Sequence, residues 1–310
     1  MLMVRKVLIC DVVDDILPKI LKDNGMDVDY NPEITKNKLL DVAKDYHTIV
    51  VRSRTRVTAE VIDAAKNCSI VARVGVGLDN IDQKAAGSKE IRVINAAEGA
   101  MNAVAELVMS VMLSLSRHIP RADRTMRDGI WEKKSLKGTE LRGKYLGIVG
   151  LGNVGQRLGR LARAFNMNII GHDVVPINPE FVQEVGLIKT DLKTLLQSSD
   201  YVSLHVPLLE STRYMINAEN LSLMKKTAYI INTSRGGIVD EMALYAALRD
   251  GRLGGAALDV FENEPPDNTP LAGLDNVILT PHLGAQTVEA QKLAAHIIAE
   301  KLVQIERGVI

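Results

Sequence analysis

The sequence predicts an α/β fold of parallel, doubly wound sheets. Short runs rich in Val, Ile and Leu alternate with segments of helical periodicity along almost the whole 310-residue chain. The strand candidates are continuously apolar, which is typical of parallel strands that helices cover on both faces. One of them, at 146–150, leads through a glycine-rich loop into a helical segment, as in a βαβ unit. These three observations together indicate the doubly wound class.

The strand candidates fall into two series along the chain. The first is expected at 6–10, 48–52, 70–74 and 92–95, and the second at 146–150, 168–173, 201–206, 228–232, 256–260 and 277–280. Helices are expected at 16–24, 59–65, 154–165, 192–197 and 242–250. So many strands exceed one compact open sheet, so we predict a smaller domain that ends near Asn95 and a larger domain after it.

Two further helices raise the question of what covers them. The last helix, 287–306, is expected to place its apolar face on Leu293, Ile297, Ile298, Leu302 and Ile305. Its periodicity leaves open which domain it packs on. The helix around 103–115 is apolar nearly all round, so either the rest of this chain or a partner must cover it.

Composition excludes several classes of function. The 38 basic side chains balance the 38 acidic ones, which argues against nucleic acid or an anionic membrane as the main partner. The two cysteines, Cys10 and Cys68, are too few for a disulfide scaffold and fit a reducing cytosol. The longest apolar stretch, 103–115, contains Glu106 and is short for a membrane span. We therefore expect a cytoplasmic protein, and no cluster of His, Cys and carboxylates indicates a metal.

The glycine-rich loop has the pattern G-x-G-x-x-G of a dinucleotide site. Gly150 permits the tight turn, Gly152 lets a pyrophosphate approach the backbone, and Gly155 allows close packing of helix on strand. The helix N-terminus supplies N–H donors and positive potential. A glycine-rich turn without a ligand is the alternative interpretation.

Asp173 strengthens the dinucleotide interpretation and selects the cofactor. It ends the next strand, about 20 residues after the loop, where a carboxylate accepts hydrogen bonds from the adenosine ribose. Its charge would repel a 2′-phosphate, and the following 174–176 segment, Val-Val-Pro, has no cation to neutralise one. The sequence therefore predicts NAD rather than NADP.

Three segments that follow predicted strands carry groups suited to acid–base chemistry on a small acid. The segment 231–240 contains Arg235, whose planar guanidinium suits a substrate carboxylate. The segment 280–287 contains His282, which can exchange a proton near neutral pH during interconversion of an alcohol and a ketone. Glu264, if paired with His282, would stabilise the imidazolium form and select its tautomer. Parallel sheets bind ligands at the carboxyl ends of their strands, so these groups are expected to meet there.

The sequence resembles the D-isomer-specific 2-hydroxyacid dehydrogenase family, and within it the short-form members that act on D-3-phosphoglycerate. The resemblance covers nearly the whole chain and includes 73–82 (RVGVGLDNID), the stretch from 138 through the glycine loop, and the Arg–Glu–His segments. It implies a Rossmann NAD-binding domain, 99–285, inserted into a flavodoxin-like substrate-binding domain made of 1–98 and 286–310. The last helix is thereby implied to return to the first domain.

The resemblance also implies roles for individual residues. Arg235 would hold the substrate carboxylate, Glu264 would orient His282, and His282 would move the hydroxyl proton. Asp259 would bind the nicotinamide amide, and the backbone of Val76 and Gly77 would bind substrate. The other cofactor contacts implied are Asn153, Val154, Val206, Pro207, Thr233 and Gly284.

An alternating arginine motif offers a phosphate site. Arg52, Arg54 and Arg56 lie at alternate positions, so an extended segment would place all three on one side. Arg52 and Arg54, with Ser53 between them, lie at the carboxyl end of a predicted strand and are expected to bind a substrate phosphate. The alternative is a solvated basic edge.

The resemblance also sets the expected reaction and its rivals. It implies NAD-dependent oxidation of D-3-phosphoglycerate to 3-phosphohydroxypyruvate and a homodimer, with the loop 129–134 against the partner. The main alternative is a glyoxylate or hydroxypyruvate reductase, and a less favoured one is an NAD(H)-sensing scaffold like some transcriptional corepressors. The chain ends at Ile310, without the regulatory domain of many relatives, so we expect no inhibition by serine. At 98–102 it also departs from the family's proline-containing loop.

Overall fold

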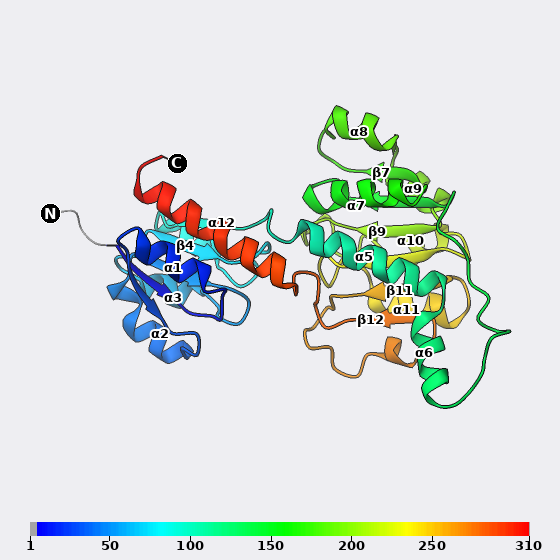
Figure 1. Cartoon of the computed structure of the whole chain (residues 1–310), viewed down its shortest axis with the longest axis horizontal. Helices are drawn as coiled ribbons and strands as arrows, with labels where there is room; N and C mark the ends of the chain where they lie inside the picture. Colours follow the sequence, from blue (N-terminus) through cyan, green and yellow to red (C-terminus); the bar gives the residue numbers. More distant parts are fainter. Residues whose placement is uncertain (1–4, 310) are drawn as a thin grey trace. The chain divides into compact units, whose positions relative to one another are not determined.

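The computed structural model describes residues 5–309, which form two compact units (Figure 1). The first unit runs to Met101 and resumes at Ala285, and the second unit is Asn102–Gly284. The extreme ends of the predicted substrate-binding domain, 1–4 and 310, lie outside the described residues. Each unit has its own parallel sheet and hydrophobic core, so each is described by itself.

The first unit contains a five-stranded parallel sheet. The strand order is β2-β1-β3-β4-β5, with β1 at Lys6–Ile9, β2 at Asp27–Tyr30, β3 at Thr48–Val51, β4 at Ile70–Arg73 and β5 at Arg92–Asn95. The helices are α1 (Ile16–Asp23), α2 (Lys36–Val42), α3 (Ala59–Ala64), α4 (Gln83–Ser88) and α12 (Val288–Glu306), with a 3-10 turn at Ala43–Asp45. β2 was not predicted, because only Val28 of its four residues is buried at this edge of the sheet.

Helix α12 lies alongside α1 in the first unit (Figure 1). The predicted apolar face is partly wrong, since Leu293 is 41% exposed. The buried face is instead rich in small residues and consists of Ala290, Ala294, Ala295, Ile298, Ala299 and Leu302. Alanine side chains permit a close approach of the two helices, which a count of large apolar residues does not reveal.

The second unit contains a seven-stranded parallel sheet in the order β12-β11-β10-β9-β6-β7-β8. The strands are β6 (Tyr145–Val149), β7 (Asn168–His172), β8 (Ile188–Lys189), β9 (Tyr201–Leu204), β10 (Tyr229–Asn232), β11 (Gly255–Leu258) and β12 (Val277–Leu279). The chain winds outward from β6 through β7 to β8, then returns to β9 beside β6 and winds the other way. This reversal is the switch point at which doubly wound sheets bind ligands. The predicted fold class is confirmed.

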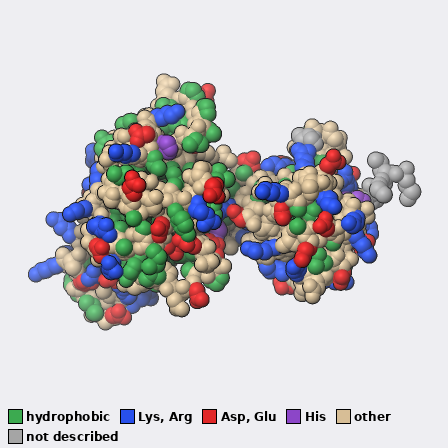
Figure 2. Space-filling view, turned by 180° about the vertical axis from the view of Figure 1, so that it is seen from behind, with side chains coloured by type: hydrophobic (Ala, Val, Ile, Leu, Met, Phe, Trp, Pro, Cys, Tyr) green, Lys and Arg blue, Asp and Glu red, His purple; other side chains and the backbone are tan. Residues whose placement is uncertain are grey.

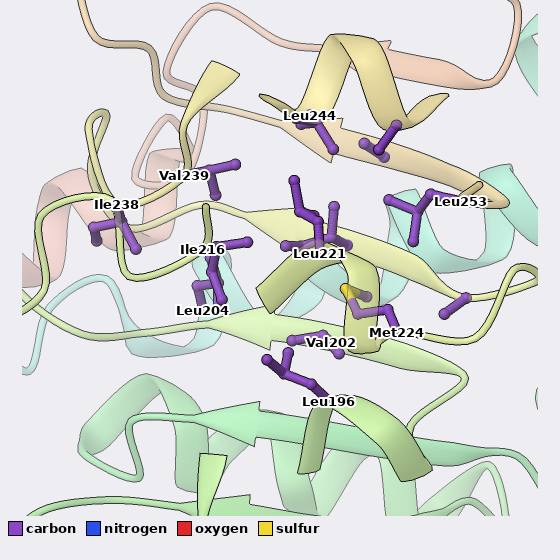
Figure 3. Close-up of a cluster of buried hydrophobic side chains, with 14 of the residues drawn as sticks. Leu196, Val202, Leu204, Ile216, Leu221, Met224, Ile238, Val239, Leu244 and Leu253 are labelled. Atoms are coloured by element: carbon purple, nitrogen blue, oxygen red, sulfur yellow. The ribbon is translucent and has the colours of Figure 1, made fainter. Parts of the chain in front are cut away.

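Helices cover both faces of the seven-stranded sheet. The helices of this unit are α5 (Met101–Ser116), α6 (Ile119–Arg127), α7 (Asn153–Ala164), α8 (Pro179–Val185), α9 (Leu192–Ser198), α10 (Ala218–Leu223) and α11 (Glu241–Arg249), with a 3-10 turn at Pro270–Gly273. All of these helices except α6 contain buried residues. Figure 3 shows one of the two core clusters, in which Val202 and Leu204 of β9 pack with Leu221 of α10 and Leu244 of α11.

The distribution of surface charge and the lengths of the helices bear on the kinds of partner. On the face shown in Figure 2, basic and acidic side chains are interspersed over both units. Within residues 5–309, no helix combines the length and apolar character that crossing a bilayer requires. The same residues contain no group of three or more His, Cys, Asp or Glu side chains placed to hold a metal ion.

Candidate active site

The glycine loop joins β6 to α7 and can take only glycine at two of its positions. Gly150 has φ +92°, and a Cβ there would lie 2.7 Å from the carbonyl carbon and oxygen of His205. A Cβ on Gly155 would lie 2.1 Å from the carbonyl oxygen of Gly150. At Gly152, by contrast, a Cβ would meet nothing within 4 Å. The loop is therefore packed tightly against the segment that follows β9 and against the first turn of α7, and it is open at Gly152.

The open side of the loop fits the pyrophosphate of NAD. Gly152 is the N-cap of α7 and has no side chain to accept the first N–H groups of the helix, which begin at Asn153 and Val154. An N-terminus of this kind favours an anion, since its N–H groups and its dipole both point toward the ligand.

Asp173 has a structural role that the sequence did not reveal. Its Oδ2 accepts a hydrogen bond from the backbone N–H of Leu151 at 2.6 Å, and its Oδ1 accepts one from that of Val175 at 3.0 Å. The carboxylate thus links the end of β7 to the middle of the glycine loop by a hydrogen bond. Its contact with the adenosine ribose stays a prediction. Val174, which follows, is 92% exposed and brings no positive charge.

The loops after β11 and β12 bring Glu264 and His282 together. Glu264 Oε2 lies 2.8 Å from His282 Nδ1, and the two side chains are 39% and 52% exposed. His282 has φ +53°, and its backbone N–H donates to the carbonyl oxygens of Asp259 and Thr280. The expected pairing is therefore present, with His282 Nε2 as the ring nitrogen that does not face the carboxylate.

Asp259 anchors the loop that carries His282. The residue is only 2% exposed. Its Oδ1 accepts the Thr280 hydroxyl at 2.6 Å and the Leu283 N–H at 2.7 Å, and its Oδ2 accepts the Gly284 N–H at 2.8 Å. The hydrogen-bond partners of this carboxylate in the structure are thus residues next to His282. Motif spacing did not suggest this structural role. The implied contact with the nicotinamide amide stays a prediction.

Arg235 sits in a turn after β10 that is closed by its neighbours. Asn232 Nδ2 donates to the Arg235 carbonyl at 2.8 Å, and Asn232 Oδ1 accepts the N–H of Ser234 at 3.1 Å. The turn also touches the loop of Glu264, because a Cβ on Gly236 would lie 1.8 Å from the Phe261 carbonyl oxygen. The structure thus packs the Arg235 and Glu264 loops against each other.

The predicted nicotinamide side includes a hydroxyl without a partner and a neutral histidine. Thr233 Oγ1 is buried and has no hydrogen-bond partner among the described residues, which fits a polar group supplied by a cofactor. His205, just before Val206 and Pro207, shares a 2.9 Å hydrogen bond between its Nε2 and Ser203 Oγ. Burial lowers the pKa of His205 to about 4, so this imidazole is uncharged at neutral pH.

The arginine motif in the first unit does not form the predicted extended row. The chain bends at Ser53 and Arg54 after β3 ends. Arg54 turns back onto the fold, where its guanidinium donates to the carbonyls of Cys10, Pro32 and Ile34 and pairs with Asp11. These bonds occupy the donors that a phosphate would need, so the geometry favours a structural role for Arg54.

Arg52 keeps a place more suited to a ligand. Its Nη2 donates to Gln286 Oε1 at 3.2 Å. A small cavity at the carboxyl edge of the five-stranded sheet is lined by Arg52, Val74 and Gly75, and also by the acidic residue Asp14. The next residue, Val76, is 37% exposed, and its carbonyl accepts from Asn95 Nδ2 at 2.6 Å. Binding of substrate by Arg52, Ser53 or the Val76–Gly77 backbone stays a prediction.

Comparisons with known proteins agree with this geometry. The family model described as D-isomer specific 2-hydroxyacid dehydrogenase, NAD binding domain, matches residues 109–284. The D-3-phosphoglycerate dehydrogenase of Methanocaldococcus jannaschii is 46% identical over 304 residues, which are 98% of this chain but 58% of that protein. The hydroxypyruvate reductase of Thermotoga maritima is 47% identical over 272 residues, which are 87% of this chain and 88% of that protein.

A solved structure shows the same fold. The D-lactate dehydrogenase of Aquifex aeolicus, complexed with NAD and lactic acid, superposes with a TM-score of 0.85 at 28% identity, over 98% of this chain and 96% of that one. The family model covers more than half of the chain, and the relatives extend the match to nearly all of it. The chain therefore belongs to the D-isomer specific 2-hydroxyacid dehydrogenase family, with its NAD binding domain in the seven-stranded unit.

Proposed function

We propose that this protein is an NAD-dependent dehydrogenase that oxidises D-3-phosphoglycerate to 3-phosphohydroxypyruvate, the first step of serine biosynthesis. The observation that carries the proposal is the 2.8 Å pair of His282 and Glu264, on loops at the carboxyl edge of the seven-stranded sheet. The Arg235 turn packs against the Glu264 loop, which brings a cation for the substrate carboxylate to the same edge. The first unit is proposed as the substrate-binding domain.

The proposed chemistry uses the two nitrogens of His282 differently. Nδ1 donates to Glu264, which selects the tautomer whose Nε2 has a free lone pair. In the oxidation, Nε2 accepts the proton of the substrate 2-hydroxyl while the 2-hydrogen leaves as hydride. NAD, when bound, supplies the acceptor for that hydride. Glu264 then stabilises the imidazolium, and Arg235 keeps the substrate carboxylate oriented.

Hydroxypyruvate reduction is the second candidate function. The hydroxypyruvate reductase relative is covered over 88% of its length, whereas the D-3-phosphoglycerate dehydrogenase relative is covered over only 58%. The two functions share the acid head group and the hydride chemistry, and they differ in the need for a phosphate site. Arg52 is the proposed phosphate ligand.

A substrate panel separates the two functions. Purified protein is assayed with 3-phosphoglycerate, phosphohydroxypyruvate, hydroxypyruvate and glyoxylate, each with NAD(H) and NADP(H). The proposal expects the highest kcat/KM for the phosphorylated pair. It also expects NAD(H) to be used better than NADP(H), because Asp173 repels a 2′-phosphate. A preference for glyoxylate or hydroxypyruvate would transfer the assignment to the second candidate. Activity with none of the four acids would refute both.

Arg52 tests the phosphate site directly. Removing a charge-assisted hydrogen bond costs about 1.5–3 kcal/mol, so Arg52→Ala should raise KM for phosphohydroxypyruvate about ten- to hundredfold. Turnover of hydroxypyruvate should change little. Arg56, an exposed arginine four residues on, is the matched control and its Ala variant should behave as wild type. Equal losses on both substrates in Arg52→Ala would mean that Arg52 supports the fold or the carboxylate site instead.

We further propose a homodimer in the cytoplasm. The dimer is supported by α6, none of whose residues is buried, and by Trp131, which is 76% exposed in the loop that follows. The cytoplasmic location is supported by the two buried cysteines, Cys10 and Cys68, both free thiols as expected in a reducing compartment.

A further inference from the structure

The turn from Phe261 to Glu264 determines where the Glu264 carboxylate points. The backbone N–H of Phe261 donates to Glu264 Oε1 at 3.2 Å, while Glu264 Oε2 faces His282 Nδ1 at 2.8 Å. The carboxylate therefore bridges its own turn and the histidine. A displacement of the backbone at 261–262 would change the orientation of Glu264 toward His282.

Glu241 holds this turn from the start of α11. Its Oε1 accepts the backbone N–H of Glu262 at 2.7 Å, and the backbone N–H of Glu241 donates in return to Glu262 Oε1 at 3.4 Å. Tyr214 completes the arrangement, since its hydroxyl donates to Glu262 Oε2 at 3.1 Å. Desolvation, together with the charge of Glu262, raises the pKa of Glu241, and the hydrogen bond to Glu262 raises that of Tyr214.

The Glu241 carboxylate is not needed as a helix cap. Asp240 already caps α11, accepting from the N–H groups of Met242 and Ala243. Glu241 instead reaches across to a residue 21 positions further along the chain. Close packing at Gly236, where a Cβ would lie 1.8 Å from the Phe261 carbonyl oxygen, keeps the turn against the Arg235 loop. The same short stretch, 235–241, thus carries the carboxylate-binding arginine and the group that holds the turn of Glu264.

We propose that Glu241 is a positioning residue for the catalytic pair: its carboxylate holds the Glu262 amide and thereby fixes the turn that points Glu264 at His282. The inference rests on the proposed function for its catalytic consequence. Its structural part, the restraint of the 261–264 turn, is independent of which acid is the substrate.

Three variants isolate the hydrogen bond. Glu241→Ala removes the acceptor, whereas Glu241→Gln keeps an oxygen in the same place without the charge. Glu219→Ala is the matched control, because Glu219 is an exposed acid in the first turn of α10 and no part of this arrangement. We expect Glu241→Ala to lower kcat for hydroxypyruvate about three- to tenfold, the effect of one lost hydrogen bond. Glu241→Gln and Glu219→Ala should stay within twofold of wild type.

A double variant distinguishes positioning from general loss of structure. If Glu241 acts through Glu264, adding Glu241→Ala to Glu264→Gln should cause less than a twofold further loss in kcat. NADH affinity, measured by fluorescence titration, should be unchanged in Glu241→Ala. Losses that multiply in the double variant, a Glu241→Gln variant as impaired as Glu241→Ala, or an unimpaired Glu241→Ala would each overturn the proposal.

Hydrogen exchange gives a readout that does not depend on activity. The peptide containing 261–264 should exchange its amides faster in Glu241→Ala than in wild type, Glu241→Gln or Glu219→Ala. Unchanged exchange in Glu241→Ala would overturn the restraint itself. If Glu241→Ala exchanged faster as expected but the wild type had no dehydrogenase activity, the proposed function would fail while the structural restraint stood. Should Glu241→Ala not fold, Glu241→Asp, which withdraws the oxygens by one methylene, takes its place in both measurements.

Discussion

At the scale of single residues, the surroundings of His282, the proposed acid–base group, differ from those of His205. His205 is enclosed at the end of β9, and burial lowers its pKa to about 4, so it is uncharged at neutral pH. His282 is half exposed and faces the Glu264 carboxylate, so its ring is accessible to a substrate. The sequence motif singled out His282, but the neutral state of His205 follows only from its surroundings in the fold.

Substitution of His282 or Glu264, the proposed catalytic pair, should affect chemistry more than cofactor binding. His282→Ala should lower kcat about 10²- to 10⁴-fold, the usual contribution of general acid–base catalysis, with NADH affinity nearly unchanged. Glu264→Gln should keep partial activity. The glutamine oxygen can still accept the His282 Nδ1 hydrogen but carries no charge to stabilise the imidazolium, so kcat should fall about tenfold.

Steady-state rates and fluorescence titration with NADH check both expectations. A Glu264→Gln variant with the wild-type kcat would refute the contribution of the Glu264 charge. Loss of NADH binding in His282→Ala would mean that the substitution disturbs the cofactor site rather than proton transfer.

At the scale of secondary-structure elements, buried parallel strands could be predicted and polar edges could not. β4 and β10 are largely buried, and their apolar runs identified them to within one or two residues. β2 alternates Val28 with aspartates, and β8 has two exposed residues, so neither shows a continuous apolar run. Nor can periodicity show that Arg54 folds back onto backbone carbonyls or that Asp259 anchors the His282 loop. Those contacts join residues far apart in sequence.

Two glycines near the connection from β6 to α7 are expected to respond differently to substitution by alanine, one mainly in stability and the other mainly in cofactor affinity. Gly155→Ala places a methyl group 2.1 Å from the Gly150 carbonyl oxygen, and such overpacking should lower the free energy of unfolding by about 1–3 kcal/mol. Gly152→Ala meets nothing within 4 Å and has an ordinary φ of −73°, so its main cost is that alanine is a poorer N-cap than glycine, about 0.5–1 kcal/mol. Its methyl group would nevertheless occupy the space through which a pyrophosphate approaches, so NADH affinity should fall roughly tenfold or more.

Thermal unfolding and NADH titration of both variants provide the measurement. Wild-type NADH affinity in Gly152→Ala would show that the pyrophosphate does not approach the loop there. A Gly155→Ala variant as stable as the wild type would mean that β6 and α7 can move apart more easily than their packing indicates.

At the scale of the whole molecule, the remaining question is what covers α6. Half of the residues of the apolar helix α5 are buried within the chain, and its Leu113 is 37% exposed. α6 is different, since none of its residues is buried. Ile119 and Met126 of α6 and Ile130 and Trp131 of the following loop are between 52% and 76% exposed. Apolar side chains concentrated in one short segment are typical of a protein interface.

A second copy of the chain is the proposed cover, and removal of its apolar contacts should separate the copies. Light scattering coupled to size exclusion should give wild type twice the chain mass of 33.9 kDa. Ile130→Ser combined with Trp131→Ser should give the monomer mass, because aromatic anchors contribute a large share of interface energy. Val288→Ser is the matched control, since Val288 is as exposed as Trp131, at 76%, but lies at the start of α12 in the other unit. A monomeric wild type would refute the dimer. A Val288→Ser variant that dissociates while the double variant stays dimeric would place the interface elsewhere.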